Sequence, residues 1–314
     1  MKNINAFKEF LTDEVNLNQS RIDTLDQKIE SIKTFLKENL DCYRKVEKQG
    51  SYAMQTIIKP VKENDEFDAD LLVYCHEIEG WSPANYIQEL HGLFKNSGNY
   101  SHLAKRKTRC VTLDYSGDFH LDLVPCVEED DSTYICNFQE NKFEETDGTG
   151  YRQWLSDKTT STNGELKRVT RLLKYLRDHK KNFTVKSILL TTMLGNSVDS
   201  ILRSEFKDTP AALFKIVNSL NTYLRNNPQM PVIKNPVLLD EDFNRHWDQE
   251  KYENFCDKIS IYHEKIEDAY YEENRNSSIL KWRKVFGDKF GTIIQNNSTP
   301  KIVVTPRKPH SIGW

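Results

Sequence analysis

Several short runs in the first half of the chain alternate apolar and polar residues, a pattern typical of half-buried β-strands. The clearest run is 67–73, whose odd-numbered positions are all apolar. Asp68 and Asp70 share the opposite face, because side chains two residues apart in a strand point the same way. A second run, 119–124, carries Asp122 on the face opposite its two leucines. The pattern therefore predicts three carboxylates on two strands, each strand with an apolar face that can enter a core.

The other strands and loops of the first half are predicted from the same pattern. Residues 43–48 are expected to form the first strand. Residues 110–115 and 118–127 are expected to pair as a hairpin around a Ser-Gly turn. The acidic stretch 128–131 and the polar stretch 140–150 are predicted to be loops.

Helical periodicity surrounds these strands. Residues 6–40 are predicted to be helical, with a break near 16–18, because apolar residues recur at spacings of three and four. A helix is expected to begin at Ser82-Pro83, since serine is a good N-cap and proline suits the first helical position. The predicted fold class is α+β, a mixed sheet with helices followed by a helical lobe. That lobe is predicted to contain helices at 165–179, 185–194, 211–224 and around 255–269.

Composition limits the classes of protein that fit this pattern. The 314 residues carry a net charge of −3, and 29% of them are charged. No window approaches the roughly 20 consecutive apolar residues of a membrane span, and the N-terminus lacks the apolar region of a signal peptide. The six cysteines include no C-x-x-C pair, which favours buried free thiols in a reducing cytosol. We therefore expect a cytoplasmic protein without a zinc site and without the basic surface that duplex DNA binding requires.

The acidic strands indicate metal-assisted phosphate chemistry. Two carboxylates side by side repel each other unless a cation lies between them, and oxygen ligands of this kind suit Mg²⁺. The turn Gly50-Ser51 can offer backbone N–H groups and a hydroxyl to phosphates. A lone Asp-x-Asp is most often a solvated strand edge, but a preceding Gly-Ser turn and a third strand-borne acid favour a two-metal site. His120, two residues before Asp122, either lines this site or has a purely structural role.

The Gly-Ser turn and the three aspartates, in this order, resemble the active-site pattern of the DNA polymerase β-like nucleotidyltransferases. The sequence motifs GSYAMQT, from residue 50, and EFDADLLV, from residue 66, are similar to those of the CD-NTases, bacterial relatives of cyclic GMP-AMP synthase and oligoadenylate synthase. Residues 168–175 resemble the lysine-bearing helix of this family, and residues 282–287 resemble its W-x-x-x-F-G segment.

The resemblance implies an architecture. It consists of a polymerase β-like nucleotidyltransferase core and a helical lobe, with the long N-terminal helix bridging both. The corresponding division of the chain is 1–150 for the bridging helix and core, 151–297 for the helical lobe, and 298–314 for an extended tail that contains three prolines.

The resemblance also implies a role for each site residue. The carboxylates of Asp68, Asp70 and Asp122 would hold Mg²⁺ or Mn²⁺, and Asp122 would help to take the proton of the attacking hydroxyl. An aromatic residue that stacks the base in relatives is replaced here by Ile188, so the nucleobase stays unassigned. For Lys174 the alternative role is that of a surface lysine, and for Ser187 it is that of an ordinary residue at a helix start. The donor triphosphate would be bound by Gln49, Gly50, Ser51, Lys174 and Ser187.

The function implied by the resemblance is condensation of nucleoside triphosphates, ATP among them, into a cyclic di- or trinucleotide second messenger in bacterial anti-phage signalling. The product would act on an effector, and the family leaves room for a protein regulator. Neither a membrane nor DNA is expected as a partner. Two alternatives are a linear oligonucleotide synthase similar to oligoadenylate synthase and an inactive relative that only binds nucleotide or protein. The presence of all three aspartates favours an active enzyme.

Overall fold

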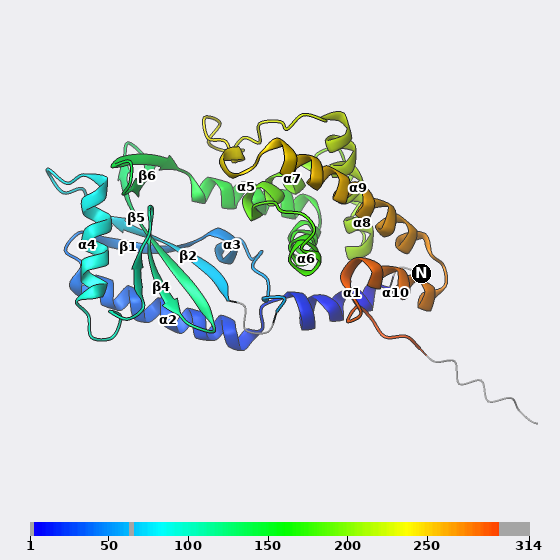
Figure 1. Cartoon of the computed structure of the whole chain (residues 1–314), viewed down its shortest axis with the longest axis horizontal. Coiled ribbons are helices and arrows are strands. Elements are labelled where there is room, and N and C mark those ends of the chain that lie inside the picture. Colours follow the sequence, from blue (N-terminus) through cyan, green and yellow to red (C-terminus); the bar gives the residue numbers. More distant parts are fainter. Residues whose placement is uncertain (1–2, 63–65, 295–314) are drawn as a thin grey trace, which may run out of the picture.

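The computed structural model describes residues 3–62 and 66–294. They form a sheet lobe, on the left of Figure 1, and a helical lobe on its right, joined along the lower edge by the N-terminal helices. The predicted α+β class is confirmed. The predicted tail 298–314 lies outside the described residues. Within these residues, no helix combines the length and the apolar character needed to cross a membrane.

The sheet has the strand order β1-β2-β5-β4-β3, with β6 beside β5 and β7 beside β6. β2 and β5 pair in parallel, and the other pairs are antiparallel. The predicted hairpin is confirmed as β4 and β5. The strands are β1 Tyr43–Gln49, β2 Phe67–Cys75, β3 Ala104–Arg106, β4 Val111–Tyr115, β5 Phe119–Glu129, β6 Ser132–Asn137 and β7 Lys142–Thr146.

The two predicted loops are largely wrong. β5 continues to residue 129, and only Asp130 and Asp131, both with positive φ, form the turn that follows. Most of 140–150 belongs to β7 and to the first turn of the next helix. Polar strands are common at a sheet edge, where one side faces solvent. Backbone pairing with β5 and β6 therefore outweighs the polar composition of these stretches.

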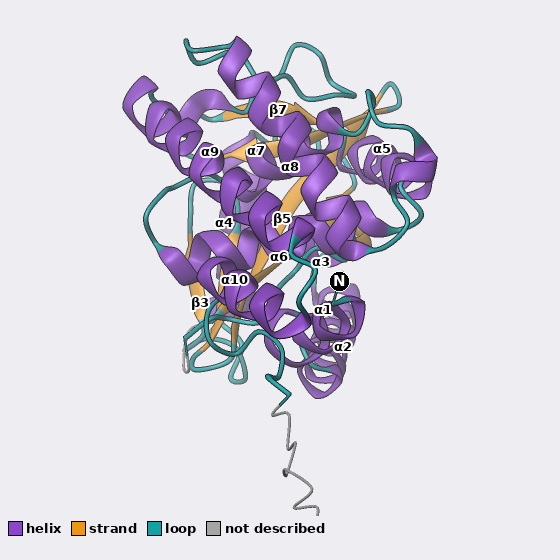
Figure 2. Ribbon diagram, turned by 90° about the vertical axis from the view of Figure 1, so that its right-hand side faces the viewer, coloured by secondary structure: helices purple, strands orange, loops and turns teal. Residues whose placement is uncertain are grey.

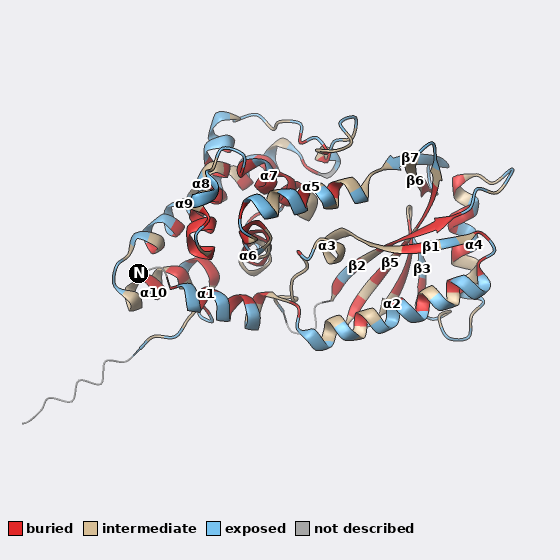
Figure 3. Cartoon of the chain, turned by 180° about the vertical axis from the view of Figure 1, so that it is seen from behind, coloured by how far each residue is buried: buried red, intermediate tan, exposed pale blue. Residues whose placement is uncertain are grey.

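Helices cover one face of the sheet and build the second lobe. α2 and α4 pack with the apolar positions of β2 and β5 in one core. Figure 3 shows the outward side of α2 exposed and the strands behind it largely buried. Figure 2 shows the helices of the second lobe gathered in front of the strands. The helices are α1 Ile4–Phe10, η1 Leu11–Val15, α2 Gln19–Asn39, α3 Gly50–Ala53, α4 Pro83–Lys95, α5 Gly148–Ser161, α6 Glu165–Lys180, α7 Ser187–Ser197, η2 Arg203–Glu205, α8 Thr209–Asn226, η3 Asn244–His246, α9 Gln249–Tyr271 and α10 Arg275–Phe286.

The N-terminal helices belong to two separate hydrophobic cores. Phe7, Phe10 and Val15 lie in the core of the helical lobe, whereas Leu25 and Ile29 of α2 lie in the core of the sheet lobe. The chain changes direction at the predicted break near 16–18, so the bridging helix is confirmed as an interrupted one. All six cysteines are free and five of them are buried, as predicted. The domain boundary at residue 150 stays a prediction.

Candidate active site

Parallel pairing of β2 with β5 brings the predicted acids together. Asp70 lies opposite Asp122 in the register, and Asp68 lies opposite His120. Each acid is flanked along its strand by buried apolar residues; Asp68 is exposed, and Asp70 and Asp122 are half-buried. The three carboxylates therefore occupy one face of two neighbouring strands, on the side away from α2 and α4.

The surroundings of Asp70 disfavour its charged form. Burial, and then the carboxylates of Asp122 and Asp68, raise the pKa of Asp70 to about 6, against the opposing charges of Lys107 and Lys174. A divalent cation placed between these carboxylates would remove their repulsion. The donor set is made of oxygen atoms alone, which suits a hard cation. The residues present therefore fit Mg²⁺ or Mn²⁺.

The turn after β1 packs directly against this carboxylate. Gly50 has a φ of +63°, and a Cβ added there would collide with Oδ2 of Asp70. Glycine is required by both the conformation and the close approach. Gln49 lies opposite Asp70 in the β1–β2 register. Ser51 lies in α3, and its carbonyl accepts a hydrogen bond of 2.9 Å from the backbone N–H of Thr56.

Asp122 has two partners that the sequence analysis missed. Thr112 lies opposite it in the β4–β5 register and donates its hydroxyl to Oδ1 of Asp122. The ammonium of Lys107 lies 3.3 Å from Oδ1 and 3.4 Å from Oδ2. The predicted hairpin placed Thr112 near Asp122, but its two-residue turn would pair Thr112 with Leu121; the three-residue turn 116–118 brings Thr112 opposite Asp122. Nothing in the local pattern indicated Lys107, which follows the short strand β3.

His120 connects the catalytic face to a second acidic group. Its Nε2 lies 2.8 Å from Glu66 and 3.5 Å from Asp114, and its Nδ1 lies 3.3 Å from Asp68. The Asp68 side chain is 73% exposed, so the imidazole is a neighbour that restrains an otherwise mobile carboxylate. Of the two roles left open for His120, lining the site or a purely structural one, these contacts are compatible with either, since they join Asp68 to Glu66 and Asp114.

Lys174 lies in the helical lobe but is not a surface lysine, because only 4% of the residue is exposed. Its ammonium donates to the Thr56 carbonyl at 2.9 Å and contacts the Thr56 hydroxyl at 3.3 Å. Burial, and then the charge of Arg177, lower its pKa to about 7. Arg171, one turn earlier, donates to the Gln55 carbonyl at 2.6 Å. α6 therefore holds the end of the GSYAMQT segment with two cations, a buried Lys174 and a half-buried Arg171.

Ser187 is the first residue of α7 and accepts a hydrogen bond of 3.2 Å from Arg177. It lines a cavity of about 740 Å³ together with Glu66, which lies at the entry of β2. Gln49 and Gly50 line a smaller cavity of about 180 Å³, which also contacts Ile188. Three of the five predicted phosphate-binding residues, Gln49, Gly50 and Ser187, therefore line these two hollows, whereas Ser51 and Lys174 line neither of them.

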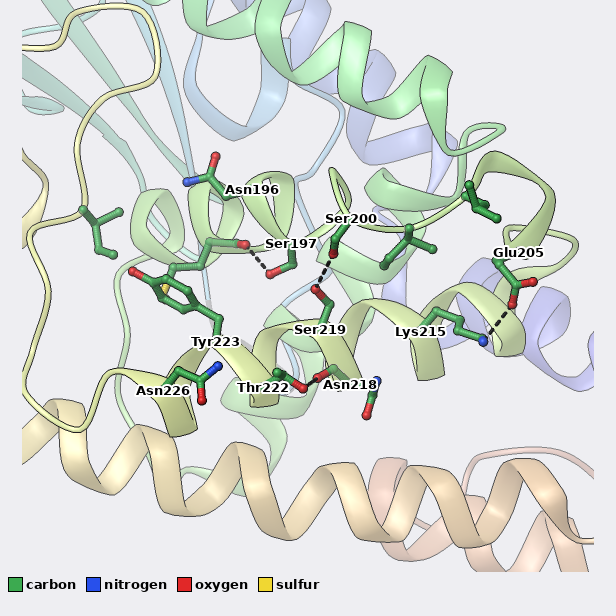
Figure 4. Close-up of a pocket in the computed structure, with 14 residues that line it drawn as sticks. Asn196, Ser197, Ser200, Glu205, Lys215, Asn218, Ser219, Thr222, Tyr223 and Asn226 are labelled. Carbon is green, nitrogen blue, oxygen red and sulfur yellow. Dashed lines mark hydrogen bonds and ion pairs between the residues drawn. The ribbon is translucent and has the colours of Figure 1, made fainter.

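A further hollow of about 620 Å³ lies within the helical lobe, between α7 and α8 (Figure 4). None of the three aspartates lines it. Among the described residues that line it, Lys215 is the one cation, and it is paired with Glu205 at 2.7 Å. This hollow therefore lacks the charges and the carboxylates that nucleotide transfer requires.

Comparison with known proteins agrees with this geometry. Residues 1–159 match the family model of the Second Messenger Oligonucleotide or Dinucleotide Synthetase domain. The c-di-GMP synthase of Roseivirga ehrenbergii is 23% identical, over 88% of this chain and 82% of that protein. The cyclic AMP-AMP-AMP synthase of Escherichia coli is also 23% identical, over 90% of this chain and 95% of that protein.

Solved structures show the same fold. The structure of Escherichia coli CdnC with ATP matches with a TM-score of 0.73 at 20% identity, covering 92% of this chain and 99% of CdnC. The complex of CdnC with HORMA-deltaN matches with a TM-score of 0.71 over 92% of this chain and 98% of CdnC. The chain therefore belongs to the family of second messenger oligonucleotide or dinucleotide synthetases. The predicted membership of the CD-NTases and the function as a nucleotidyltransferase that makes such messengers are confirmed.

Proposed function

We propose that the chain condenses nucleoside triphosphates, ATP among them, into a cyclic di- or trinucleotide, with Mg²⁺ or Mn²⁺ held by Asp68, Asp70 and Asp122. The observation that carries this proposal is the register pairing of Asp70 with Asp122, directly beside the Gly50 turn. This pairing supports a divalent-cation site beside a phosphate-binding backbone on one strand face.

Transfer of this kind depends on positioning and on charge neutralisation more than on covalent chemistry. Bound divalent ions would neutralise the triphosphate and make the attacking hydroxyl easier to deprotonate. Asp122 would receive that proton, the hydroxyl oxygen would bond to the α-phosphorus of the donor, and pyrophosphate would leave. The backbone N–H groups near Gly50 and the Ser51 hydroxyl would bind the donor triphosphate from the sheet lobe, with Gln49 beside them.

The helical lobe would complete the phosphate site. Ser187 accepts the hydrogen bond of Arg177, so its own hydroxyl proton is available to a phosphate oxygen. Lys174 holds Thr56 at the far end of the same segment and adds positive charge behind the triphosphate. An incoming phosphate would raise the pKa of this ammonium and keep it charged.

A closed ring is the favoured product. The net charge of −3 does not favour the strongly basic surface that a growing strand would follow. The relatives named above include one synthase of a dinucleotide and one of a trinucleotide, which supports a ring of two or three units. The complex of CdnC with HORMA-deltaN supports a protein regulator for this chain, and the product would carry the anti-phage signal to an effector.

The experiment is incubation of the purified chain with four labelled nucleoside triphosphates and Mg²⁺ or Mn²⁺, followed by phosphatase and mass spectrometry. We expect a phosphatase-resistant product whose mass equals a whole number of nucleoside monophosphates, less one water each. Asp68→Asn combined with Asp70→Asn should abolish it without changing the circular dichroism spectrum. A ladder of phosphatase-sensitive products would indicate a linear synthase, and wild-type turnover in the double variant would rule out this site.

A further inference from the structure

Asp122 is restrained from two sides by residues that the proposed mechanism does not use. Thr112, behind it on β4, donates its hydroxyl to Oδ1. Lys107, in front of it, places its ammonium within 3.4 Å of both carboxylate oxygens. The two neighbours differ in burial, because Thr112 is 2% exposed whereas the Lys107 side chain is 53% exposed.

Thr112 lies on the face of the sheet that carries Asp122, because its neighbours along β4, Val111 and Leu113, are fully buried in the core on the opposite face. Valine at this position would keep the branched side chain and lose the hydroxyl. A buried hydroxyl costs stability unless it is hydrogen-bonded. Apart from a long contact of 3.9 Å to the Cys110 sulfur, its bond goes to Asp122. The hydroxyl therefore holds Oδ1, whereas Oδ2 takes no hydrogen bond from Thr112.

Lys107 makes a different kind of contact. An ammonium that spans both oxygens of a carboxylate occupies the direction from which a divalent ion would approach. Two cations repel each other strongly at such short distance. Since most of this side chain is in solvent, it can withdraw at little cost.

We propose that Thr112 is a positioning residue that orients Asp122 for a metal ion, and that Lys107 is a counter-ion that the metal ion displaces. The inference rests on the proposed function, because it takes Asp122 as a metal ligand. It goes beyond that function because it assigns to two neighbours of the Asp122 carboxylate opposite effects on metal affinity. Loss of the Thr112 hydroxyl weakens metal binding, and loss of the Lys107 charge strengthens it.

The test is titration of the dialysed full-length chain with Mn²⁺, followed by electron paramagnetic resonance of the free ion. Thr112→Val should lower Mn²⁺ affinity about 10- to 100-fold, the usual effect of removing a group that orients a metal ligand. Thr112→Ser, which keeps the hydroxyl, should restore it. Lys107→Met should raise the affinity about two- to fivefold, as expected for loss of an exposed ion pair.

Two control variants separate these effects from general ones. Lys105→Met removes a neighbouring ammonium that pairs with Asp114 at 2.5 Å, and it should leave Mn²⁺ affinity unchanged. Thr170→Val removes a buried hydroxyl that donates to the Leu166 carbonyl of the same helix at 2.8 Å. It should have the same thermal stability as Thr112→Val and leave the Mn²⁺ affinity unchanged. In turnover assays Thr112→Val should lower kcat without raising KM for the nucleotide.

The outcomes distinguish this inference from the proposed function. If Asp122→Asn abolishes Mn²⁺ binding while Thr112→Val and Lys107→Met leave the affinity unchanged, the inference is wrong and the metal site stands. If Asp122→Asn itself binds Mn²⁺ like the wild type, Asp122 is not a ligand and the proposed function fails with it. A raised KM for nucleotide in Lys107→Met, with unchanged Mn²⁺ affinity, would make Lys107 a substrate contact and overturn its assignment as a counter-ion.

Discussion

A single carboxyl group, that of Asp70, links the geometry of the site to the stability of the protein. Its pKa is about 6 in the folded chain, above the ordinary value of 3.8, because of burial and the neighbouring carboxylates. The folded state therefore binds this proton more tightly than the unfolded state does. Above pH 6, the ionised Asp70 lowers the free energy of unfolding by its full amount. This loss disappears as the pH falls from 6 towards 3.8.

Asp70→Asn should accordingly raise the free energy of unfolding of the metal-free chain by about 2 kcal/mol at pH 7.5, and hardly at all at pH 4. Urea unfolding at the two pH values measures the difference. Asp68→Asn is the matched control, because its largely exposed side chain should give a smaller change. An equal gain for Asp70→Asn at both pH values would show that the ionisation of Asp70 is not its cause.

Lys174 leads to a second prediction at this scale. Its pKa of about 7 lies below the ordinary 10.5, so its charged form costs stability below pH 7, and this cost disappears as the pH rises towards 10.5. A bound triphosphate should recharge the ammonium. ATP binding at pH 7.5 should therefore take up a fraction of a proton, measured by calorimetry in two buffers of different ionisation enthalpy. Lys174→Met should lose this uptake and raise KM about tenfold or more. Equal uptake in the variant would assign the proton to another group.

The elements around the site determine how near the backbone comes to the carboxylates. At Gly50 both the left-handed φ and the contact with Asp70 exclude a side chain, whereas Gly80 has a φ of +79° and open space around it. Gly50→Ala and Gly80→Ala should each lose about 1–2 kcal/mol of stability from backbone strain. Only Gly50→Ala should also abolish turnover, because it displaces the turn or the carboxylate. Comparable activity in the two variants would mean that the close approach has no functional role.

The strength of the periodicity within each element explains which elements could be predicted. The strand that carries Asp68 and Asp70 and the helix that carries Lys174 have strong periodicities, and both were predicted correctly. β7 was missed because its side chains are mostly polar and its pairing with β6 makes it a strand. β6 was not predicted although Thr133, Tyr134 and Ile135 favour a strand. Residues 128–131 were assigned wholly to a loop because acidic composition does not reveal where a hairpin turns.

At the scale of the whole molecule, the N-terminal helices tie the two lobes together. Phe7 is fully buried, with its ring centre 4.8 Å from that of Trp282 and 4.9 Å from that of Phe290. Phe7→Ala should therefore destabilise the chain by about 3–5 kcal/mol, measured by thermal unfolding with tryptophan fluorescence. Ile4→Ala, at a position that is 47% exposed, should change it by less than about 0.5 kcal/mol. A similar small effect at Phe7 would contradict the packing of this segment in the helical lobe.

The sequence by itself determined the strand faces, the three aspartates, the glycine turn and the family, because alternation, spacing and motif order are properties of the chain alone. Only the tertiary structure decided what these groups contact. The placement of Asp70 against Asp122 depends on the parallel pairing of β2 with β5, and no local pattern encodes a partner strand far away in the chain. Lys174 was expected to bind phosphate or lie on the surface, but the packing of the two lobes buries it against Thr56. Long-range pairing and desolvation thus set the charge states and contacts of residues whose identity was already evident.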